Sequence, residues 1–367
     1  MSAVGKITFG SSQRDFTATL NKRVNDYFKT NQLSKHANGE MILKTILMIS
    51  LYFVPYAMLI SGVVTGVWAA LAMVVLMGFG LAGIGLSVMH DGNHGAYSSK
   101  KWVNDLMGYM LNVIGASAFN WKVQHNVLHH SYTNVFGADE DIGKEDILRF
   151  APQAKWRPHH KYQYIYAWFL YGLMTISWMF FKDFNQIIKY QKTGMIKQQK
   201  SNASAQWAIL IATKIGYLGY IFVVPLLLTS WAWWQILIGI LIMHYITGFI
   251  LAIIFQPAHV IEGTSFPQPD QKNSLQDNWA IHQIHTTTDF ARDDRVFTWL
   301  VGGLNHQVEH HLFPGICHVH YPTIARIVES TAAEFNIPYK KVKTFGDALK
   351  GHMKMLKYFG KKPTSMA

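Results

Sequence analysis

The sequence of 367 residues contains one cysteine, Cys317, and few charged residues. A single cysteine excludes a secreted domain stapled by intrachain disulfides. Asp, Glu, Lys and Arg make up 15% of the chain, whereas about 25% is typical of a soluble domain. The first residues also lack the apolar run of a signal peptide, so we expect no cleaved leader. These absences disfavour both a secreted protein and an ordinary soluble domain.

Hydrophobic residues make up half of the chain, which excludes a disordered protein. They gather in long runs, and we predict transmembrane helices at residues 45–64, 66–88, 208–229 and 231–256. Short turns at Thr65 and Ser230 would join these helices as two hairpins. Lys214 interrupts the third run, and we expect its amine to extend to the membrane interface. The predicted fold is an all-α polytopic membrane protein.

The chain has 33 Lys and Arg against 21 Asp and Glu, an excess that could indicate nucleic acid, an anionic surface or membrane topology. All of the basic residues except Lys214 lie outside the four predicted helices. The positive-inside rule then places residues 1–44, 89–205 and 257–367 on the cytoplasmic face. Topology therefore explains the charge, and we expect no nucleic-acid partner. We divide the chain into an N-terminal segment, 1–44, and a membrane domain, 45–367.

One further apolar run, residues 162–181, is long enough to span a membrane. A fifth span would move the basic segments that follow it to the opposite face, against the positive-inside rule. Trp and Tyr are frequent in this run, as they are in segments that lie at the membrane surface. We therefore expect an interfacial or re-entrant helix.

The 18 histidines fall in clusters. The clustered residues are His90 and His94; His125, His129 and His130; and His310 and His311, with His259 placed three residues after the last predicted membrane helix. Residues four apart share one face of an α-helix, so His125 and His129 should point together and His130 elsewhere, toward a second ion. The sequence predicts a metal site on the cytoplasmic side.

A single pair of histidines four residues apart often arises by chance, and such histidines are usually packing residues. Three clusters on one side of a membrane are harder to explain without metal, because imidazoles buried side by side lose their hydration. Eight histidines exceed the ligand number of one zinc ion. A ligand set of nitrogens without thiolate suits iron, copper, nickel or zinc, and its size suits two ions.

The segments WKVQHNVLHHSYTN (residues 121–134) and GGLNHQVEHHLFP (residues 302–314) resemble the histidine boxes of the integral-membrane fatty acid desaturases. The resemblance covers the chain from about residue 45 onward. It implies an O2-dependent oxidoreductase with two iron ions, O2 as co-substrate and a histidine-rich cytoplasmic cap. The iron ligands that it implies are His90, His94, His125, His129, His130, His310 and His311, with His259 as an additional ligand.

Gln307 stands where many desaturases have the first histidine of the third box. This replacement resembles the front-end branch, whose members insert a double bond between an existing one and the carboxyl end of the acyl chain. The Gln307 amide oxygen remains a possible iron ligand. His306 lies one residue out of register, and we interpret it as a residue that packs beside the ligands.

Carboxylates are expected to accept hydrogen bonds from the outer ring N–H groups of the ligands. The candidates are Asp91, Asp139, Asp141 and Asp289, each of which could equally be a helix cap or a solvated loop residue. We expect an apolar tunnel between the membrane helices, with His244 either packed by hydrogen bonds or lining it. His282 and His285 are not assigned as ligands.

The expected partners are the membrane, an acyl substrate carried on CoA or on a lipid, and a separate electron donor of the ferredoxin or cytochrome b type. We expect a separate donor because 44 residues precede the first predicted helix and the haem-binding motif HPGG does not occur. These features favour the inner membrane of a bacterium. Two alternatives stay open: a hydroxylase with the same boxes, and a metal or haem transporter. The predicted spans contain no Asp, Glu or Arg, which disfavours transport.

Overall fold

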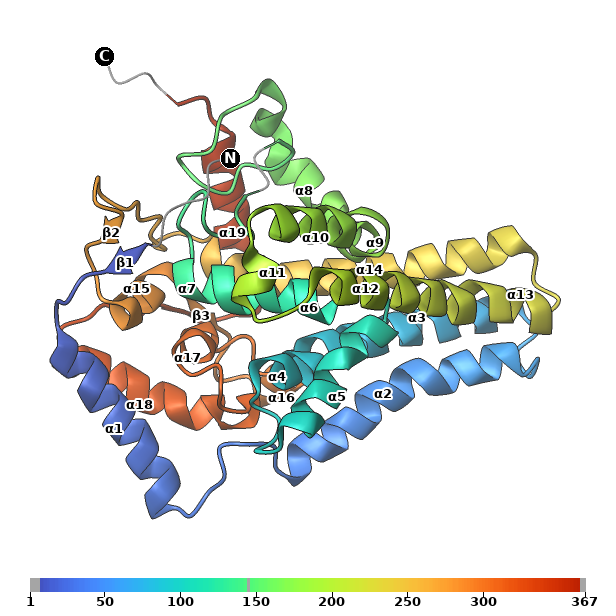
Figure 1. The fold of residues 1–367 in the computed structure, drawn as a ribbon, viewed down its shortest axis with the longest axis horizontal. Coiled ribbons are helices and arrows are strands. Elements are labelled where there is room, and N and C mark those ends of the chain that lie inside the picture. Colours follow the sequence, from blue (N-terminus) through green and yellow to red (C-terminus); the bar gives the residue numbers. More distant parts are fainter. Residues whose placement is uncertain (1–6, 144–145, 364–367) are drawn as a thin grey trace. The chain divides into compact units, whose positions relative to one another are not determined.

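The computed structural model of the protein describes residues 7–143 and 146–363, whose regular secondary structure is almost entirely helical (Figure 1). The α-helices are α1 (Arg14–Thr30), α2 (Gly39–Ile60), α3 (Val67–Gly83), α4 (Met89–His94), α5 (Lys101–Val113), α6 (Ala118–Trp121), α7 (His130–Tyr132), α8 (Gln163–Gly172), α9 (Met174–Ser177), α10 (Asp183–Lys192), α11 (Met195–Gln198), α12 (Ala203–Leu218), α13 (Val224–Leu228), α14 (Trp233–His259), α15 (Trp279–Thr286), α16 (Arg295–Leu300), α17 (Gln307–Leu312), α18 (Tyr321–Glu334) and α19 (Phe345–Gly360). The π-helices are η1 (Ile84–Val88), η2 (Lys122–His129), η4 (Trp178–Lys182) and η5 (Gly219–Val223), and the 3₁₀-helices are η3 (Pro158–Tyr162) and η6 (His318–His320).

The chain folds into two compact units. Unit 1 comprises Met1–His36, Gln124–Trp168 and Ile253–Ala367, and unit 2 comprises Ala37–Val123 and Phe169–Ala252. Unit 1 therefore contains the second and third histidine clusters and His259, and unit 2 contains His90 and His94.

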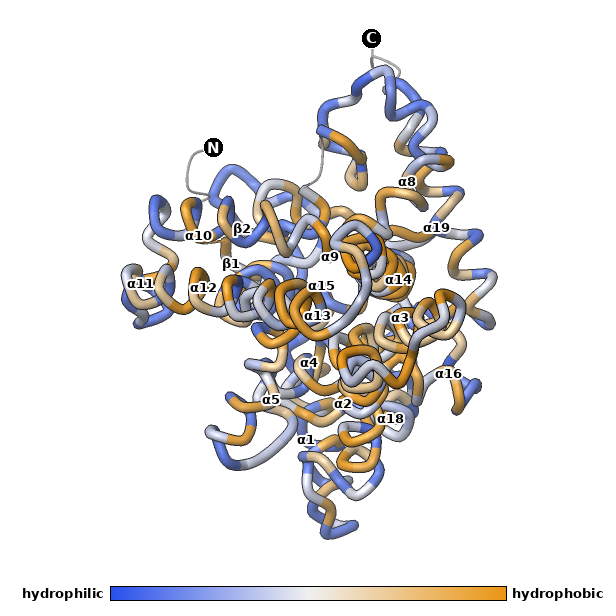
Figure 2. Tube along the Cα trace, turned by 90° about the vertical axis from the view of Figure 1, so that its right-hand side faces the viewer, coloured by the Kyte–Doolittle hydropathy of each residue, from blue (hydrophilic) through white to orange (hydrophobic). Residues whose placement is uncertain are grey.

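In the part of the chain that the structure describes, four helices are long and apolar enough to cross a membrane: Gly39–Ile60, Val67–His94, Ala203–Leu228 and Trp233–His259. Figure 2 shows α3 and α13 mostly in the hydrophobic colour. The prediction of an all-α protein with four membrane helices is confirmed, but its boundaries need correction. The first helix begins at Gly39, and the last helix ends at His259, so His259 is part of that helix instead of following it.

The helices α2 and α3 run side by side as a hairpin in unit 2 (Figure 1). A Cβ atom on Gly80 of α3 would lie 2.6 Å from the backbone nitrogen of Tyr52 on α2. Only glycine permits this approach, as is common between helices in membranes. The hairpin begins at Asn38, whose side chain caps α2 by accepting a hydrogen bond from the Met41 backbone N–H.

Lys214 lies within the third membrane helix, and its side chain does not extend to the interface as the sequence suggested. The side chain is buried, and its Nζ donates to the carbonyl oxygens of Gly115 and Trp178 and to Asp183 Oδ2, each at 2.7 Å. Three acceptors satisfy all three ammonium hydrogens. Because burying an unpaired charge is costly, the amine remains inside the protein with these partners.

The apolar run at residues 162–181 is not a straight helix. Pro158–Gly172 and Met174–Lys192 form a helix pair that is bent by 61°. A bend of this size fits either a broken span or a re-entrant segment, and the second is what the charge pattern predicts.

Unit 1 has a helical core to which two short parallel ladders are added. Strand β1 (Thr8–Phe9) pairs with β2 (Ser274–Leu275), and β3 (Asp289–Phe290) pairs with β4 (Lys341–Val342). The helix α1 buries the apolar side chains that recur on one of its faces. They belong to one core with buried residues of α15, α17 and α18, so the N-terminal segment helps to support the third histidine cluster.

Candidate metal centre

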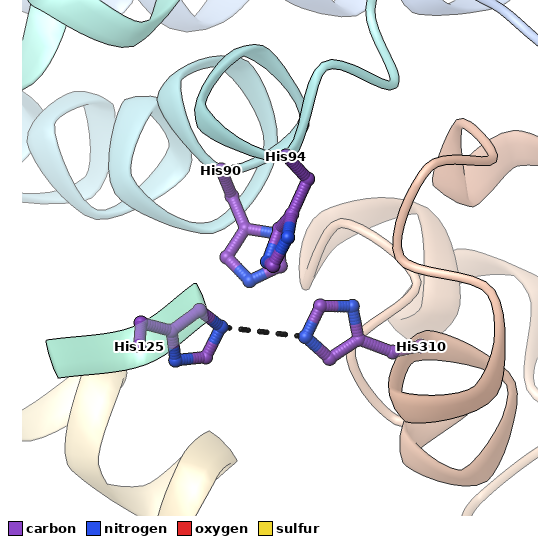
Figure 3. Close-up of side chains that lie close together, drawn as sticks. All are labelled: His90, His94, His125 and His310. Carbon is purple, nitrogen blue, oxygen red and sulfur yellow. Dashed lines mark hydrogen bonds between the residues drawn. The ribbon is translucent and has the colours of Figure 1, made fainter. Parts of the chain in front are cut away.

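The first histidine cluster lies on α4 in unit 2, where the π-helix η1 joins α4 to α3. The rings of His90 and His94 have their centroids 4.8 Å apart, and Trp121 packs edge-on against both. Figure 3 shows the two rings next to each other on α4. The spacing of four residues thus places them together, as expected for an α-helix.

The second cluster agrees with its prediction in part. The rings of His125 and His129 stack with their centroids 5.3 Å apart, as predicted, but residues 122–129 form the π-helix η2. Hydrogen bonds in a π-helix join residues five apart. Accordingly His130, not His129, brings its Nε2 within 3.2 Å of His125 Nε2. π-Helical turns are frequent at functional sites, and here the turn changes which histidines face each other.

His310 of α17 completes this first trio. Its Nε2 lies 2.9 Å from His130 Nε2 and 3.4 Å from His125 Nε2, the second contact being the dashed line in Figure 3. Neighbouring ligands on one ion at 2.0–2.1 Å would be about 3.0–3.4 Å apart. The three nitrogens therefore have the mutual spacing of ligands on a single metal ion.

His129, His259 and His311 form a second trio, whose ligand nitrogens lie within 4.8 Å of one another. In each ring Nδ1 faces an oxygen: Asp139 at 3.1 Å, the Thr286 carbonyl at 3.3 Å and Gln283 Oε1 at 2.8 Å, respectively. An imidazole that donates through Nδ1–H presents Nε2 as its ligand atom. The surroundings thus select the same ring nitrogen in all three residues.

Asp139 is the buried carboxylate that fixes His129. Both of its oxygens lie 3.1 Å from His129 Nδ1, and the backbone N–H groups of Asn134 and Asp141 also donate to it. Burial lowers the pKa of His129, but the charges of Asp139 and Asp141 outweigh burial and raise it to about 9. In turn, the imidazole and these hydrogen bonds lower the pKa of Asp139. Such a carboxylate orients a histidine ligand and increases its basicity.

The other predicted carboxylates occupy different positions. Asp141 Oδ2 lies 3.4 Å from His129 Nδ1, and Asp91 is buried on α4. Asp289 has the alternative role of a helix cap, because its Oδ1 accepts a hydrogen bond at 3.0 Å from the Val308 backbone N–H, and its Oδ2 accepts one from the Tyr339 hydroxyl. Asp289 therefore contacts the backbone of α17 instead of an imidazole N–H.

His306 and Glu309 are buried beside this helix. His306 Nδ1 lies 3.8 Å from Glu309 Oε2, and burial lowers the pKa of His306 to about 4. Burial and the neighbouring Asp289 raise the pKa of Glu309 well above its usual value, and the Tyr339 hydroxyl donates to Glu309 at 2.9 Å. His306 thus packs against a carboxylate of the third cluster.

Gln307 is the first residue of α17. Its Nε2 donates to the Leu304 carbonyl at 2.7 Å. The amide oxygen of Gln307 therefore points away from Leu304. Its side chain also lies near His259. Gln307 therefore lies beside the second trio.

Two supporting residues had no signal in the sequence. Gln283 Oε1 faces His311 Nδ1 and also accepts a hydrogen bond from the Thr133 hydroxyl at 2.8 Å, while Gln283 Nε2 donates to the His130 carbonyl at 3.1 Å. The Tyr321 hydroxyl lies 3.3 Å from His310 Nδ1. A glutamine and a tyrosine distant along the chain cannot be assigned to particular histidines before the fold is known.

The histidines that were not assigned as ligands have other contacts. His285 is partly exposed, and its Nδ1 lies 2.8 Å from Asp277 Oδ2. His282 is buried, and its ring packs edge-on against Phe9 with centroids 5.4 Å apart.

Known proteins that resemble this chain are fatty acid desaturases. Residues 66–343 match the model of the fatty acid desaturase family. The chain is 36% identical to the sn-1 linoleoyl-lipid 6-desaturase of Arthrospira platensis, covering 100% of this chain and 98% of that protein. It is 37% identical to the acyl-lipid (8-3)-desaturase of Physcomitrium patens, covering 95% and 72%, and 35% identical to the sn-1 linoleoyl-lipid 6-desaturase of Synechocystis sp., covering 96% and 97%.

Proposed function

This chain belongs to the fatty acid desaturase family, and on that premise we propose that it is a front-end desaturase that acts on lipid-linked, already unsaturated acyl chains. It is an integral membrane protein and an oxidoreductase. The proposed substrate class agrees with the names of the relatives in Arthrospira platensis and Synechocystis sp., which are linoleoyl-lipid desaturases.

The observation that carries the proposal is the pair of nitrogen trios in unit 1. We propose that one iron ion is bound by His125, His130 and His310, and the other by His129, His259 and His311. The family resemblance adds His90 and His94 to the ligands of this iron pair. When bound, the irons supply the O2 chemistry that removes two hydrogens from neighbouring carbons of the acyl chain.

The chain's own residues prepare this site in three ways. The imidazoles of the second trio offer Nε2 to a metal because oxygen acceptors hold their Nδ1–H groups, and His129 would release its Nε2 proton when the metal binds. The two charged groups nearest His129, Asp139 and Asp141, offset part of the positive charge that two ions introduce. The ligand rings of unit 1 are each less than 10% exposed, and this burial keeps water from competing with O2 and substrate.

The experiment that tests the proposal is a fatty-acid profile of a host that expresses the protein. Saturated and diunsaturated acids are supplied in parallel, and the position of each new double bond is determined. We expect conversion of the diunsaturated chain, with the new double bond on the carboxyl side of the existing ones. Efficient attack on the saturated chain alone would contradict the front-end assignment, and hydroxy acids would indicate a hydroxylase.

Gln307 offers a test of the second iron position, because its side chain lies near His259. We expect Gln307→Ala to lose activity by about 10–100-fold, the cost typical of removing a group that orients a ligand. Gln307→His should be tolerated better, since imidazole offers a nitrogen donor at the same place. Turnover and bound iron are measured for both variants. Wild-type turnover and wild-type iron content in Gln307→Ala would show that Gln307 is not part of the site.

A further inference from the structure

We propose that Tyr217 and His244, which are joined by a hydrogen bond, close the end of a binding slot for the acyl chain in unit 2. We call this pair of residues the stop. The stop limits how many carbons the acyl chain can have beyond the carbons that are oxidised. The inference rests on the proposed function, because it takes an acyl chain as the substrate. It adds two specificity-determining residues that are far along the sequence from the histidine boxes.

Unit 2 contains a small cavity, which we call the slot, beside Met89, the first residue of α4 and the neighbour of His90. Leu81, about two turns earlier on the same membrane helix, also lines it, and so do the side chains of Leu111, His244 and Leu251. Met89 and Leu81 are about eight residues apart, or roughly 10–12 Å along the helix. With C–C bonds of about 1.5 Å, this distance corresponds to about eight to ten carbons of an extended chain.

The slot is almost closed, with a volume of about 10 Å³. Flexible methionine and leucine side chains form much of its wall, so an entering chain can displace them. A second cavity of about 450 Å³ has an apolar wall that includes Met77, one turn before Leu81, and Met243, the neighbour of His244. The two cavities thus have neighbouring lining residues on the same two membrane helices.

Hydrogen bonds hold His244, which lines the slot, in place. The Tyr217 hydroxyl lies 2.5 Å from His244 Nε2, and the Thr175 hydroxyl lies 3.2 Å from His244 Nδ1. Thr175 also donates to the His244 carbonyl at 2.8 Å. These contacts join α9, α12 and α14, so they hold the imidazole at the end of the slot from two sides.

The Tyr217 ring is positioned by Gly115, which also lines the slot. A Cβ atom on Gly115 would lie 2.7 Å from the ring, and the φ of this residue is +94°. Glycine is therefore required both by the backbone conformation and by the close packing of Tyr217. Tyr217 and His244 are almost fully buried.

Buried polar side chains in membrane helices commonly serve only to join helices. That role accounts for the hydrogen bonds of His244 but not for the position of its imidazole, which lines the slot while the neighbouring Met243 lines the larger apolar cavity. A purely structural role would change the amount of folded protein and leave the preference for chain length unaltered. The length preference is therefore the measurement that separates the two roles.

The test uses the full-length protein in a host that is fed two diunsaturated acids differing by four methylenes on the methyl side. We expect His244→Ala to raise the ratio of longer to shorter product about tenfold or more, because one methylene in an apolar pocket already changes discrimination by about that factor. His244→Phe keeps the bulk and should leave the ratio near that of the wild type. Leu71→Ala, which enlarges only the wide cavity, is the matched control and should not change the ratio.

An active His244→Ala protein with the wild-type ratio would overturn the inference. If this variant does not accumulate, Tyr217→Leu decides, because it replaces the ring whose hydroxyl contacts His244 with a smaller side chain: a raised ratio supports the stop, and an unchanged ratio overturns it. Failure of the proposed function can be distinguished from failure of this inference, because in the first case the wild-type protein would form no new double bond in either acid.

Discussion

His129→Ala should reduce desaturase activity by more than about 100-fold, since removing a ligand costs more than the 10–100-fold typical of a residue that orients one. It should also lower bound iron from about two ions per chain toward one. The reason is that His129 belongs to only one of the two trios, together with His259 and His311. Turnover in membranes and iron in the purified protein are the two measurements.

The matched control is His285→Ala. His285 lies on α15 of the same unit and also pairs with a carboxylate, Asp277, but it is partly exposed. This variant should keep its iron and its activity. Near-normal turnover in His129→Ala, or an equal loss in His285→Ala, would contradict the assignment of the second trio.

Asp139→Asn should weaken iron binding and lower turnover by about 10–100-fold, the cost typical of removing a carboxylate that orients a ligand. Asparagine has nearly the same shape, but it has no charge to balance the metal. Its NH₂ group also cannot accept the N–H groups of His129, Asn134 and Asp141 that both oxygens of Asp139 now face. Retention of iron during dialysis against a chelator measures the effect apart from activity.

Asp277→Asn provides the control for the charge change, because Asp277 also accepts a hydrogen bond from a histidine, His285, outside the trios. We expect wild-type retention of iron in this variant. If Asp139→Asn keeps iron as well as Asp277→Asn does, Asp139 has only the role of a loop cap.

Features that depend on local periodicity could be predicted from the sequence. Apolar runs without acidic residues identified four membrane helices, and their existence did not depend on details of packing. The spacing of His90 and His94 was interpreted correctly because α4 is a regular α-helix. The carboxylate Asp139 was a candidate because it follows the second cluster closely along the chain.

Other features depend on the tertiary structure. The pairing of His125 with His130 results from the π-helix η2, which places residues five apart together and which no periodicity in the sequence indicated. Lys214 was expected at the interface, because its acceptors on Gly115, Trp178 and Asp183 come from segments distant along the chain.

Long-range contacts also determine how the carboxylates and amides near the histidines are used. Asp289 and Gln283 have similar positions relative to the third cluster in sequence, yet Asp289 accepts from the backbone of α17 while Gln283 faces His311. The distinction depends on side-chain direction in the folded unit, which composition and spacing do not specify.

Iron content of the purified wild-type protein tests the central claim most directly. The six histidines of unit 1 form two trios, and each trio has its ring nitrogens close enough together to bind one metal ion. The account therefore predicts about two iron ions per chain. The count is made by elemental analysis on protein that desaturates a diunsaturated acyl lipid. Two irons per active chain is the predicted result, and full activity in protein that holds one iron ion or none would contradict the account.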